Sequence, residues 1–428
     1  MRKPVHSSRL MPNTINTMTT KPVLLLRILI PGLLVAATGV GAGDLSIASF
    51  TGSQLGLSVL WAVVLGGIFK FVLTEGLARW QLASGDTFIE GIATHFGAWV
   101  GFIFLPYLLL WSFFVGAALM AACGVTLHAL IPLFDDASQG KIFFGILSSL
   151  IGCVLVWFGG YQLFEKIMAI AIGSMFIIVM ATAFILWPGH AAVLHGLFNP
   201  AVANLSGEGF AWTLALIGGV GGTLTILCYG YWIQENNRHG TEHLSRCQFD
   251  LAVSYSMTVL FGIAMVIIGS GIELKGSGAN LLILLSERLS TAAAPWAGTF
   301  FLIGALGAVL SSLLGVWQAV PYLFADIWSL YVKKEVRSTA QAFTHSIPYK
   351  VYLIALTFIP MAGLLFSFKE IQKLYALIGS LFIPFVALAL LILNNSERWM
   401  GDYKNRVFSN LALTGTLFFF IYITWQKW

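Results

Sequence analysis

An apolar segment near the start of the chain contains the stretch Thr38-Gly39-Val40-Gly41-Ala42-Gly43-Asp44, and an apolar segment of the second half contains Gly218-Gly219-Val220-Gly221-Gly222-Thr223-Leu224-Thr225. So many glycines suit a membrane helix only if its backbone opens. An opened backbone is tolerated in a bilayer only where protein or a water-filled cavity surrounds it. Interruptions at matching places in two halves are typical of the substrate site of transporters built from inverted repeats. The two stretches therefore predict a secondary transporter with its site between two broken helices.

The composition agrees with a chain that lies mostly within a membrane. Of the 428 residues, 58% are hydrophobic and only 10% are charged, and the mean hydropathy is +0.86. Soluble domains contain about 25% charged residues. We therefore expect the lipid bilayer to surround the chain and expect no nucleic-acid partner. The four cysteines form no recognisable disulfide framework.

Apolar runs of membrane length predict an all-α integral membrane protein with about 11 transmembrane helices. The expected spans are 23–53 (broken near 39–44), 57–83, 99–131, 141–158, 164–187, 210–233 (broken near 218–225), 248–273, 294–330, 349–367, 371–394 and 407–426. The segment 279–291 is too short to span. It predicts either an amphipathic helix on the membrane surface or a loop helix packed on the bundle.

The distribution of basic residues predicts the orientation. With the N-terminus inside, 16 of the 23 Lys and Arg residues fall on the cytoplasmic side and 6 on the other, as the positive-inside rule requires. We therefore expect a cytoplasmic tail (1–22) and a single transport domain (23–426) in a cell (plasma or inner) membrane, with the C-terminus outside. Two five-helix repeats of opposite orientation, at about 23–187 and 210–394, would be followed by an extra helix at about 407–426.

Asp44 is the first candidate for substrate binding, because an acid within an apolar span is a functional candidate by default. Carbonyls freed at a broken helix coordinate cations, so Gly41 and Gly222 are candidates as well, and the Thr225 hydroxyl adds an oxygen. Such oxygen ligands suit hard cations. Alternatively, Asp44 is the N-cap of a half-helix that begins at Leu45.

Cys228 is a candidate additional ligand, because it lies three residues after Thr225 and can share its helix face. A thiolate would favour softer metals. The alternative is that Cys228 is a small buried hydrophobic residue. Ser311 and Ser312 could likewise line the site or pack helices together.

Four further ionisable residues are candidates for coupling or gating. Lys70 and Glu75 lie within the second span, followed by Arg79 one turn later. Lys70 could act as a built-in cation; the simpler interpretation is that it snorkels to the interface, with Glu75 and Arg79 as an i,i+4 pair. Asp326 could gate the inner mouth or pair with a cytoplasmic base.

Three segments resemble the Nramp (natural resistance-associated macrophage protein) family of divalent metal transporters. The run Pro31–Asp44, continued by Ala48–Gly56, is similar to the family's first helix; Leu77–Gly85 looks like the end of its second helix; and Met400–Arg406 is similar to its Met-Gly…Asn-Arg segment before a late helix. The resemblance implies a leucine-transporter-type inverted repeat (helices 1–5 and 6–10) with broken helices 1 and 6.

The metal site that this resemblance implies is altered here. The family has Asp-Pro-Gly-Asn in helix 1, where this chain has Gly41-Ala42-Gly43-Asp44, so the first acid is missing and Asp44 stands at the Asn position. The family's Ala-x-x-Met-Pro-His in helix 6 aligns with Gly222 at the Ala and Thr225 at the Met. The resemblance thus implies a rebuilt site with Asp44 and Thr225 as metal ligands, without the family's thioether or its usual proton-coupling acids.

The sequence therefore predicts a secondary active transporter, not an enzyme, that moves a divalent metal cation (Mn, Fe or Mg class) by alternating access. The metal is cargo, and no resident cofactor is expected. One alternative is an amino-acid-like organic-solute transporter of the same fold; another is a sensor that binds without transport. A third is a membrane-embedded zinc enzyme, since His239-Gly240-Thr241-Glu242-His243 matches a zinc-peptidase pattern.

Overall fold

The computed structural model describes residues 21–97, 99–200, 207–272, 277–333 and 340–426, and within these ranges it contains helices and connections but no strand. Most of the predicted cytoplasmic tail (1–22) lies outside the described residues. The all-helical prediction is confirmed.

The first half of the chain contains α1 (Lys21–Gly39), the π-helix η1 (Val40–Ile47), α2 (Ala48–Leu55), α3 (Leu60–Ser84), α4 (Phe88–Phe96), α5 (Trp99–Leu130) and α6 (Ala137–Ile185), and α7 (His190–Phe198) follows. The second half contains α8 (Glu208–Gly219), the 3₁₀-helix η3 (Leu224–Cys228), α9 (Tyr229–Glu235), α10 (Leu244–Gly269), α11 (Leu281–Ala292), α12 (Pro295–Trp328), the π-helix η5 (Ser329–Lys333), α13 (Ala340–Thr344), α14 (Ile347–Phe358), α15 (Phe368–Ser380) and α16 (Phe382–Leu393). The last helices are α17 (Glu397–Met400) and α18 (Val407–Gln426).

These helices correspond to the predicted spans. Eight helical stretches among the described residues are long and apolar enough to cross a membrane, and Leu29–Gly39 and Val407–Tyr422 are shorter apolar helices. The longest stretch, α6, bends at Gly160, whose φ of 65° and ψ of 173° leave the helical region. The bend separates the predicted spans 141–158 and 164–187. Predicted span 371–394 is divided at Leu381 into α15 and α16.

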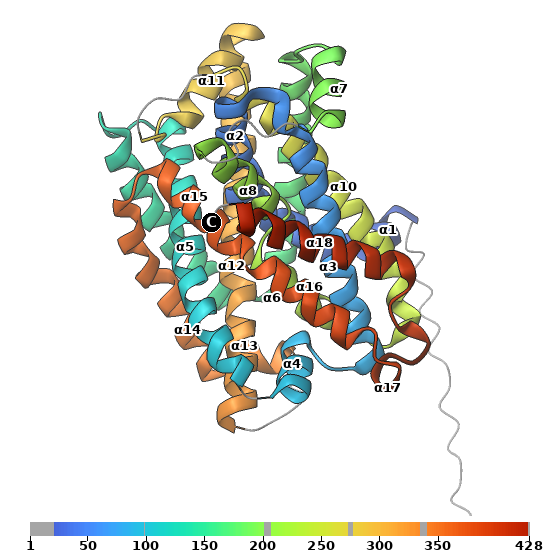
Figure 1. The fold of residues 1–428 in the computed structure, drawn as a ribbon. Helices are drawn as coiled ribbons and strands as arrows, with labels where there is room; N and C mark the ends of the chain where they lie inside the picture. The colour runs from blue at the N-terminus through green and yellow to red at the C-terminus, as the bar shows by residue number, and fades with distance from the viewer. Residues whose placement is uncertain (1–20, 98, 201–206, 273–276, 334–339, 427–428) are drawn as a thin grey trace, which may run out of the picture.

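The connecting helices, together with α2, lie at two opposite ends of the bundle. Figure 1 shows α4, α13 and α17 at the lower end, and α2, α7 and α11 at the upper end. The connections after even-numbered predicted spans (α4, α13 and α17) thus lie at one end, and those after odd-numbered spans (α7 and α11) lie at the other. Successive membrane-crossing helices require this alternation. Of the two interpretations of segment 279–291, the structure supports the packed loop helix, because four leucines of α11 are buried against the bundle: Leu281, Leu282, Leu285 and Leu289.

The interrupted helices lie in the interior of the bundle. The label of α8 stands near the centre of Figure 1, between α3 and α15, and α8 contacts both of them and η1. Every residue from Trp212 to Ile233 except Leu214 is buried. Both glycine-rich stretches are thus enclosed by protein, as an irregular backbone at membrane depth requires.

Candidate substrate site

Helix 1 of the predicted repeat comprises α1, η1 and α2. Its interruption takes the form of a π-helix rather than an extended segment. Gly39 keeps a right-handed helical conformation (φ −77°, ψ −35°), and η1 continues directly into α2. Its glycines allow close contact with helix 6. A Cβ on Gly43 would lie 2.2 Å from the backbone oxygen of Gly219, and one on Gly39 would lie 2.7 Å from the amide nitrogen of Gly222.

Helix 6 comprises α8, η3 and α9, and its interruption is an opened backbone. α8 ends at Gly219, and Gly221 and Gly222 have φ values of +72° and +84°, in the region that only glycine adopts at low cost. Thr223 is also non-helical before η3 begins at Leu224. The four residues 220–223 therefore expose carbonyls at the end of α8 and N–H groups before η3.

Asp44 lies between the two interruptions and is completely buried. Its Oδ2 accepts a hydrogen bond from the Gly221 N–H at 3.3 Å. Its Oδ1 has no hydrogen-bond partner among the described residues. Asp44 is therefore not the N-cap of a half-helix from Leu45, since it lies inside η1 and binds the other broken helix. The structure provides a buried carboxylate oxygen with free acceptor capacity where the two helices meet.

Lys70 does not snorkel to the interface. It lies in α3 and is completely buried. Its Nζ donates hydrogen bonds to the carbonyl oxygens of Gly218 at 2.7 Å and Val220 at 3.3 Å, and also to that of Gly222. The simpler sequence interpretation was wrong because the carbonyl end of α8 offers the ammonium a partner inside the protein.

The backbone of helix 1 is bound by hydroxyl groups of α12. Gly41 donates its N–H to the Ser312 Oγ at 2.7 Å, and that hydroxyl donates to the Ala37 carbonyl at 2.9 Å. Ser311 donates to the same carbonyl at 3.1 Å. The two serines thus stabilise the π-helix in addition to packing two helices together.

Thr225 and Cys228 lie in η3, where residues three apart eclipse each other. This spacing is the one that the predicted shared face requires. Thr225 is 5% exposed, and its Oγ1 lies beside Gly222, 2.5 Å from where a Cβ would stand. Cys228 is completely buried and not disulfide-bonded.

Glu75 and Arg79 form the predicted i,i+4 pair, with 3.1 Å between Arg79 Nη2 and Glu75 Oε2. The other carboxylate oxygen accepts a hydrogen bond from Gln248 of α10 at 3.0 Å. Arg79 also donates to the Tyr403 carbonyl at 3.4 Å. The pair therefore links α3 to α10 and to the segment before α18.

Asp326 is bound by hydroxyl groups rather than by the expected cytoplasmic base. Its Oδ2 accepts hydrogen bonds from Tyr231 of α9 at 2.6 Å and from Thr87 at 2.8 Å. Thr87 is also the N-cap of α4, where its hydroxyl accepts from the Glu90 N–H. The expected pairing fails because the hydroxyls of Tyr231 and Thr87 fill the surroundings of this buried carboxylate, which is only 1% exposed. Asp326 thus joins α12, α9 and the start of α4.

A further buried acid, Asp250 of α10, was missed by the sequence analysis. Its carboxylate accepts hydrogen bonds from the Gly32 N–H at 2.9 and 3.0 Å and from Tyr229 at 3.1 Å, and it forms a salt bridge of 3.1 Å with Arg238. The signal was present, since Asp250 is an acid near the start of a predicted span. This cluster ties the first half of helix 1 to the second half of helix 6.

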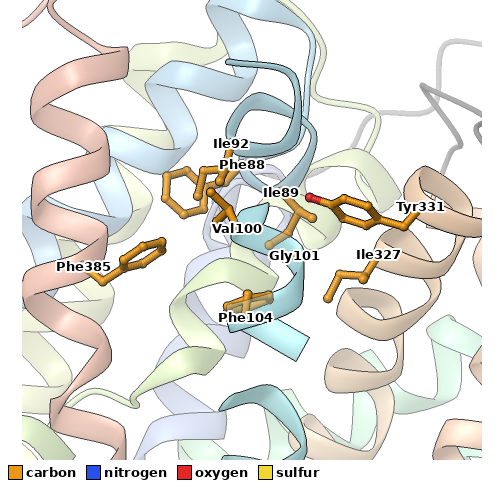
Figure 2. Close-up of a pocket in the computed structure, with 9 residues that line it drawn as sticks. All are labelled: Phe88, Ile89, Ile92, Val100, Gly101, Phe104, Ile327, Tyr331 and Phe385. Atoms are coloured by element: carbon orange, nitrogen blue, oxygen red, sulfur yellow. The ribbon is translucent and has the colours of Figure 1, made fainter. Parts of the chain in front are cut away.

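Several pockets in the described part of the chain lie apart from Asp44, and two of them adjoin helices of the candidate site. A cavity of about 290 Å³ lies beside α9, where Glu235, Gln318, Tyr322 and Tyr349 contribute polar groups to a lining that is otherwise largely apolar. An apolar pocket lies between α4, α5, α12 and α16, and Figure 2 shows mainly aliphatic and aromatic side chains around it. Its lining provides no acid or base for binding a cation.

The zinc-peptidase pattern forms no metal site. Thr241–His243 is a short 3₁₀-helix, and His243 Nε2 lies 3.9 Å from Glu242 Oε1. Within the described ranges, no group of three or more His, Cys, Asp or Glu side chains could hold a metal ion. The broken helices therefore remain the candidate site.

The helical bundle and its two interrupted central helices define a transporter of the leucine-transporter type. The chain belongs to the natural resistance-associated macrophage protein-like (Nramp) family, whose model matches residues 32–426. It is therefore an integral membrane protein of a metal-transporter family and not an enzyme. No curated protein sequence gives a significant match.

Solved structures of low sequence identity share the fold. One structure of the Eremococcus coleocola manganese transporter is 16% identical, with a TM-score of 0.72, and covers 98% of this chain and 88% of that one. The same transporter in complex with an aromatic bis-isothiourea compound is also 16% identical, with a TM-score of 0.70, and covers 96% of this chain and 87% of that one. MhsT in complex with L-phenylalanine is 16% identical, with a TM-score of 0.66, and covers 94% of this chain and 98% of that one. These similarities confirm the predicted fold class.

Proposed function

We propose that this chain is a secondary active transporter of a divalent metal cation of the Mn, Fe or Mg class. The observation that carries the proposal is the position of Asp44: a completely buried carboxylate between the two interrupted helices, with Oδ1 unpartnered among the described residues. A buried charge is costly unless a counter-charge or ligand accompanies it. A cation bound at Oδ1 would provide that interaction.

The remaining ligands of the proposed site are oxygen atoms. We assign the Gly41 and Gly222 carbonyls and the Thr225 hydroxyl, which lies beside Gly222, as further ligands, because carboxylate, carbonyl and hydroxyl oxygens suit hard cations such as Mg²⁺ or Mn²⁺. Cys228 lies on the face of Thr225 and would add a softer ligand. The manganese named for the Eremococcus coleocola transporter supports the same cation class.

We further propose that transport occurs by alternating access, with α9 tilting relative to α8 about the opened residues 220–223. Hydrogen bonds from Tyr231 and Thr87 to Asp326 would hold the cytoplasmic end closed. The Glu75–Arg79 pair would act at the same end. The 290 Å³ cavity beside Glu235 would form part of the inner route. This assignment uses the predicted orientation, with the N-terminus in the cytoplasm.

An organic-solute transporter of the same fold is the second candidate, and a specific observation favours it. Asp44 and Lys70 carry opposite charges and bind the same four-residue opening, so the site as a whole could accept a zwitterion. MhsT, a structural neighbour, is solved with L-phenylalanine. Stabilisation of the purified protein by amino acids but not by metals would favour this candidate.

Uptake into liposomes that contain the purified protein tests the main proposal. Mg²⁺, Mn²⁺, Fe²⁺ and Ca²⁺ are compared with and without a pH gradient. Saturable uptake of at least one ion is expected, and the effect of the gradient reports whether protons are coupled. Absence of uptake for all four ions would contradict the proposal.

Thr225→Met tests the part of the proposal that concerns ligand softness. A thioether at this position should shift the preference from Mg²⁺ toward Mn²⁺, because sulfur favours softer metals. Thr225→Val is the matched control, since it removes the hydroxyl without adding sulfur. An unchanged ion ranking in Thr225→Met would remove Thr225 from the ligand set.

A further inference from the structure

The ammonium group of Lys70 has a complete set of partners in the opening of helix 6. A lysine ammonium has three N–H donors and no acceptor. Three backbone carbonyls accept from it, those of Gly218, Val220 and Gly222. Lys70 is completely buried, so these contacts take the place of water. The number of donors matches the number of acceptors.

The three carbonyls are also a set of ligands for a cation. They lie at the end of α8 and in the opening after it, where a helix leaves carbonyls without intrahelical partners and where its dipole is negative. Hard cations bind such oxygen atoms. The Lys70 ammonium therefore occupies the position that a bound metal or alkali cation would take at this helix end.

Asp44 binds the opposite pole of the same opening. Its Oδ2 accepts from the N–H of Gly221, between the two carbonyls of Val220 and Gly222 that Lys70 contacts. Each side chain thus binds the backbone group that its charge favours. Among the described residues the two side chains form no ion pair within 4 Å, and Oδ1 of Asp44 keeps its acceptor capacity.

We propose that Lys70 is a tethered cation that competes with the transported cation for the carbonyls of helix 6, and that it thereby sets the affinity and charge selectivity of the Asp44 site. The identity of the transported cation rests on the function proposed above, whereas the competition does not. A cation at Asp44 binds beside a fixed positive charge as long as Lys70 remains in the opening. Removal of that charge exposes three carbonyls to the cation.

Lys70→Met is the main test, because methionine is unbranched and apolar and supplies no N–H donor. Purified wild type, Lys70→Met and Lys70→Met/Asp44→Asn are titrated with Mg²⁺, Mn²⁺, Ca²⁺ and Na⁺ by calorimetry, and their melting temperatures are measured with chelator and with each ion. Lys404→Met is the control, since Lys404 is an exposed lysine near the chain's last helix.

We expect Lys70→Met to bind at least one of these cations at least tenfold more tightly than the wild type. In chelator, the melting temperature of Lys70→Met should lie below that of the wild type. Addition of the cation should raise it by more than it raises the wild-type melting temperature. The double variant should lose the gain, and Lys404→Met should match the wild type. Equal affinities of Lys70→Met and wild type for every cation would overturn the proposal.

Lys70→Gln keeps the test decisive if Lys70→Met does not fold. Its amide supplies two N–H donors to the carbonyls but no charge, so tighter cation binding is again expected, and wild-type affinity would again contradict the proposal. Liposome uptake separates the two proposals. Metal uptake by the wild type without any gain in the Lys70 variants would leave the transport function standing and reject the competition. Tighter cation binding by the Lys70 variants without metal uptake by the wild type would support the competition and reject the transport function.

Discussion

The two glycine-rich stretches look alike in the sequence but use glycine for different physical reasons. In helix 1, Gly39 and Gly43 remain in helical structure and are small because the backbone of helix 6 lies against them. In helix 6, Gly221 and Gly222 adopt positive φ values that open the backbone. Glycine in helix 1 thus allows close packing of two backbones, whereas glycine in helix 6 allows a non-helical backbone conformation.

The freed backbone groups of the two stretches also have different partners. In helix 1 the neutral hydroxyls of Ser311 and Ser312 bind the backbone. In helix 6 the charged side chains of Asp44 and Lys70 do so. The charges therefore concentrate at the opened helix, and the π-helix supplies the carboxylate. Substitutions that separate packing, backbone conformation and hydrogen bonding test this comparison.

Gly43→Ala should have the largest effect. Its Cβ would lie 2.2 Å from the Gly219 carbonyl oxygen, a backbone atom that no side-chain movement can displace. We expect a loss of about 3 kcal/mol or more, at the upper end of overpacking costs, and almost no folded protein in size-exclusion chromatography. Gly173→Ala is the control, because nothing lies within 4 Å of that Cβ. A well-folded Gly43→Ala variant would contradict the close approach.

Gly222→Ala should have an intermediate effect with a different origin. Its φ of +84° costs an alanine about 1–2 kcal/mol, and its Cβ would lie 2.5 Å from Thr225 Oγ1. The added substitution Thr225→Ala should restore part of the melting temperature, since it removes the contact but not the strain. Gly85→Ala (φ +82°, nothing within 4 Å) measures the strain alone. Full recovery in the double variant would show that positive φ is not the reason for this glycine.

Ser312→Ala should have the smallest effect. It removes the hydrogen bonds to Gly41 and Ala37, and hydrogen bonds between membrane helices contribute about 0.6 kcal/mol each on average. We expect a loss of about 1 kcal/mol and a small fall in melting temperature, with cation binding retained. A loss of binding as large as that of an Asp44 variant would mean that the hydroxyl belongs to the cation site.

Much of the fold could be predicted because membrane spans depend on length and hydropathy, which are local properties. The two interruptions were visible for the same reason, since glycine runs stand out in apolar segments. The form of the first one was not predictable: a π-helix and an extended opening place the same glycines in the same order. The helical conformation of Gly39 and the close approach of Gly43 to Gly219, which depend on tertiary packing, distinguish them.

The candidate site was less accessible to sequence analysis, because its contacts join residues far apart in the chain. Lys70 donates to carbonyls about 150 positions later, and nothing local distinguishes it from a lysine that snorkels to the interface. Asp326 was expected to pair with a base, whereas Tyr231 and Thr87 bind it. Partners of buried charges depend on tertiary packing, which periodicity does not encode.

The most direct test of the central claim is metal uptake by Asp44→Asn in liposomes. The asparagine keeps the size and an oxygen that accepts from the Gly221 N–H, so the variant removes only the charge. Glu287→Gln, at an exposed acid of α11, is the matched control. We predict that Asp44→Asn folds and loses uptake of the ion that the wild type transports, while Glu287→Gln retains it. Wild-type uptake by a folded Asp44→Asn variant would contradict the account.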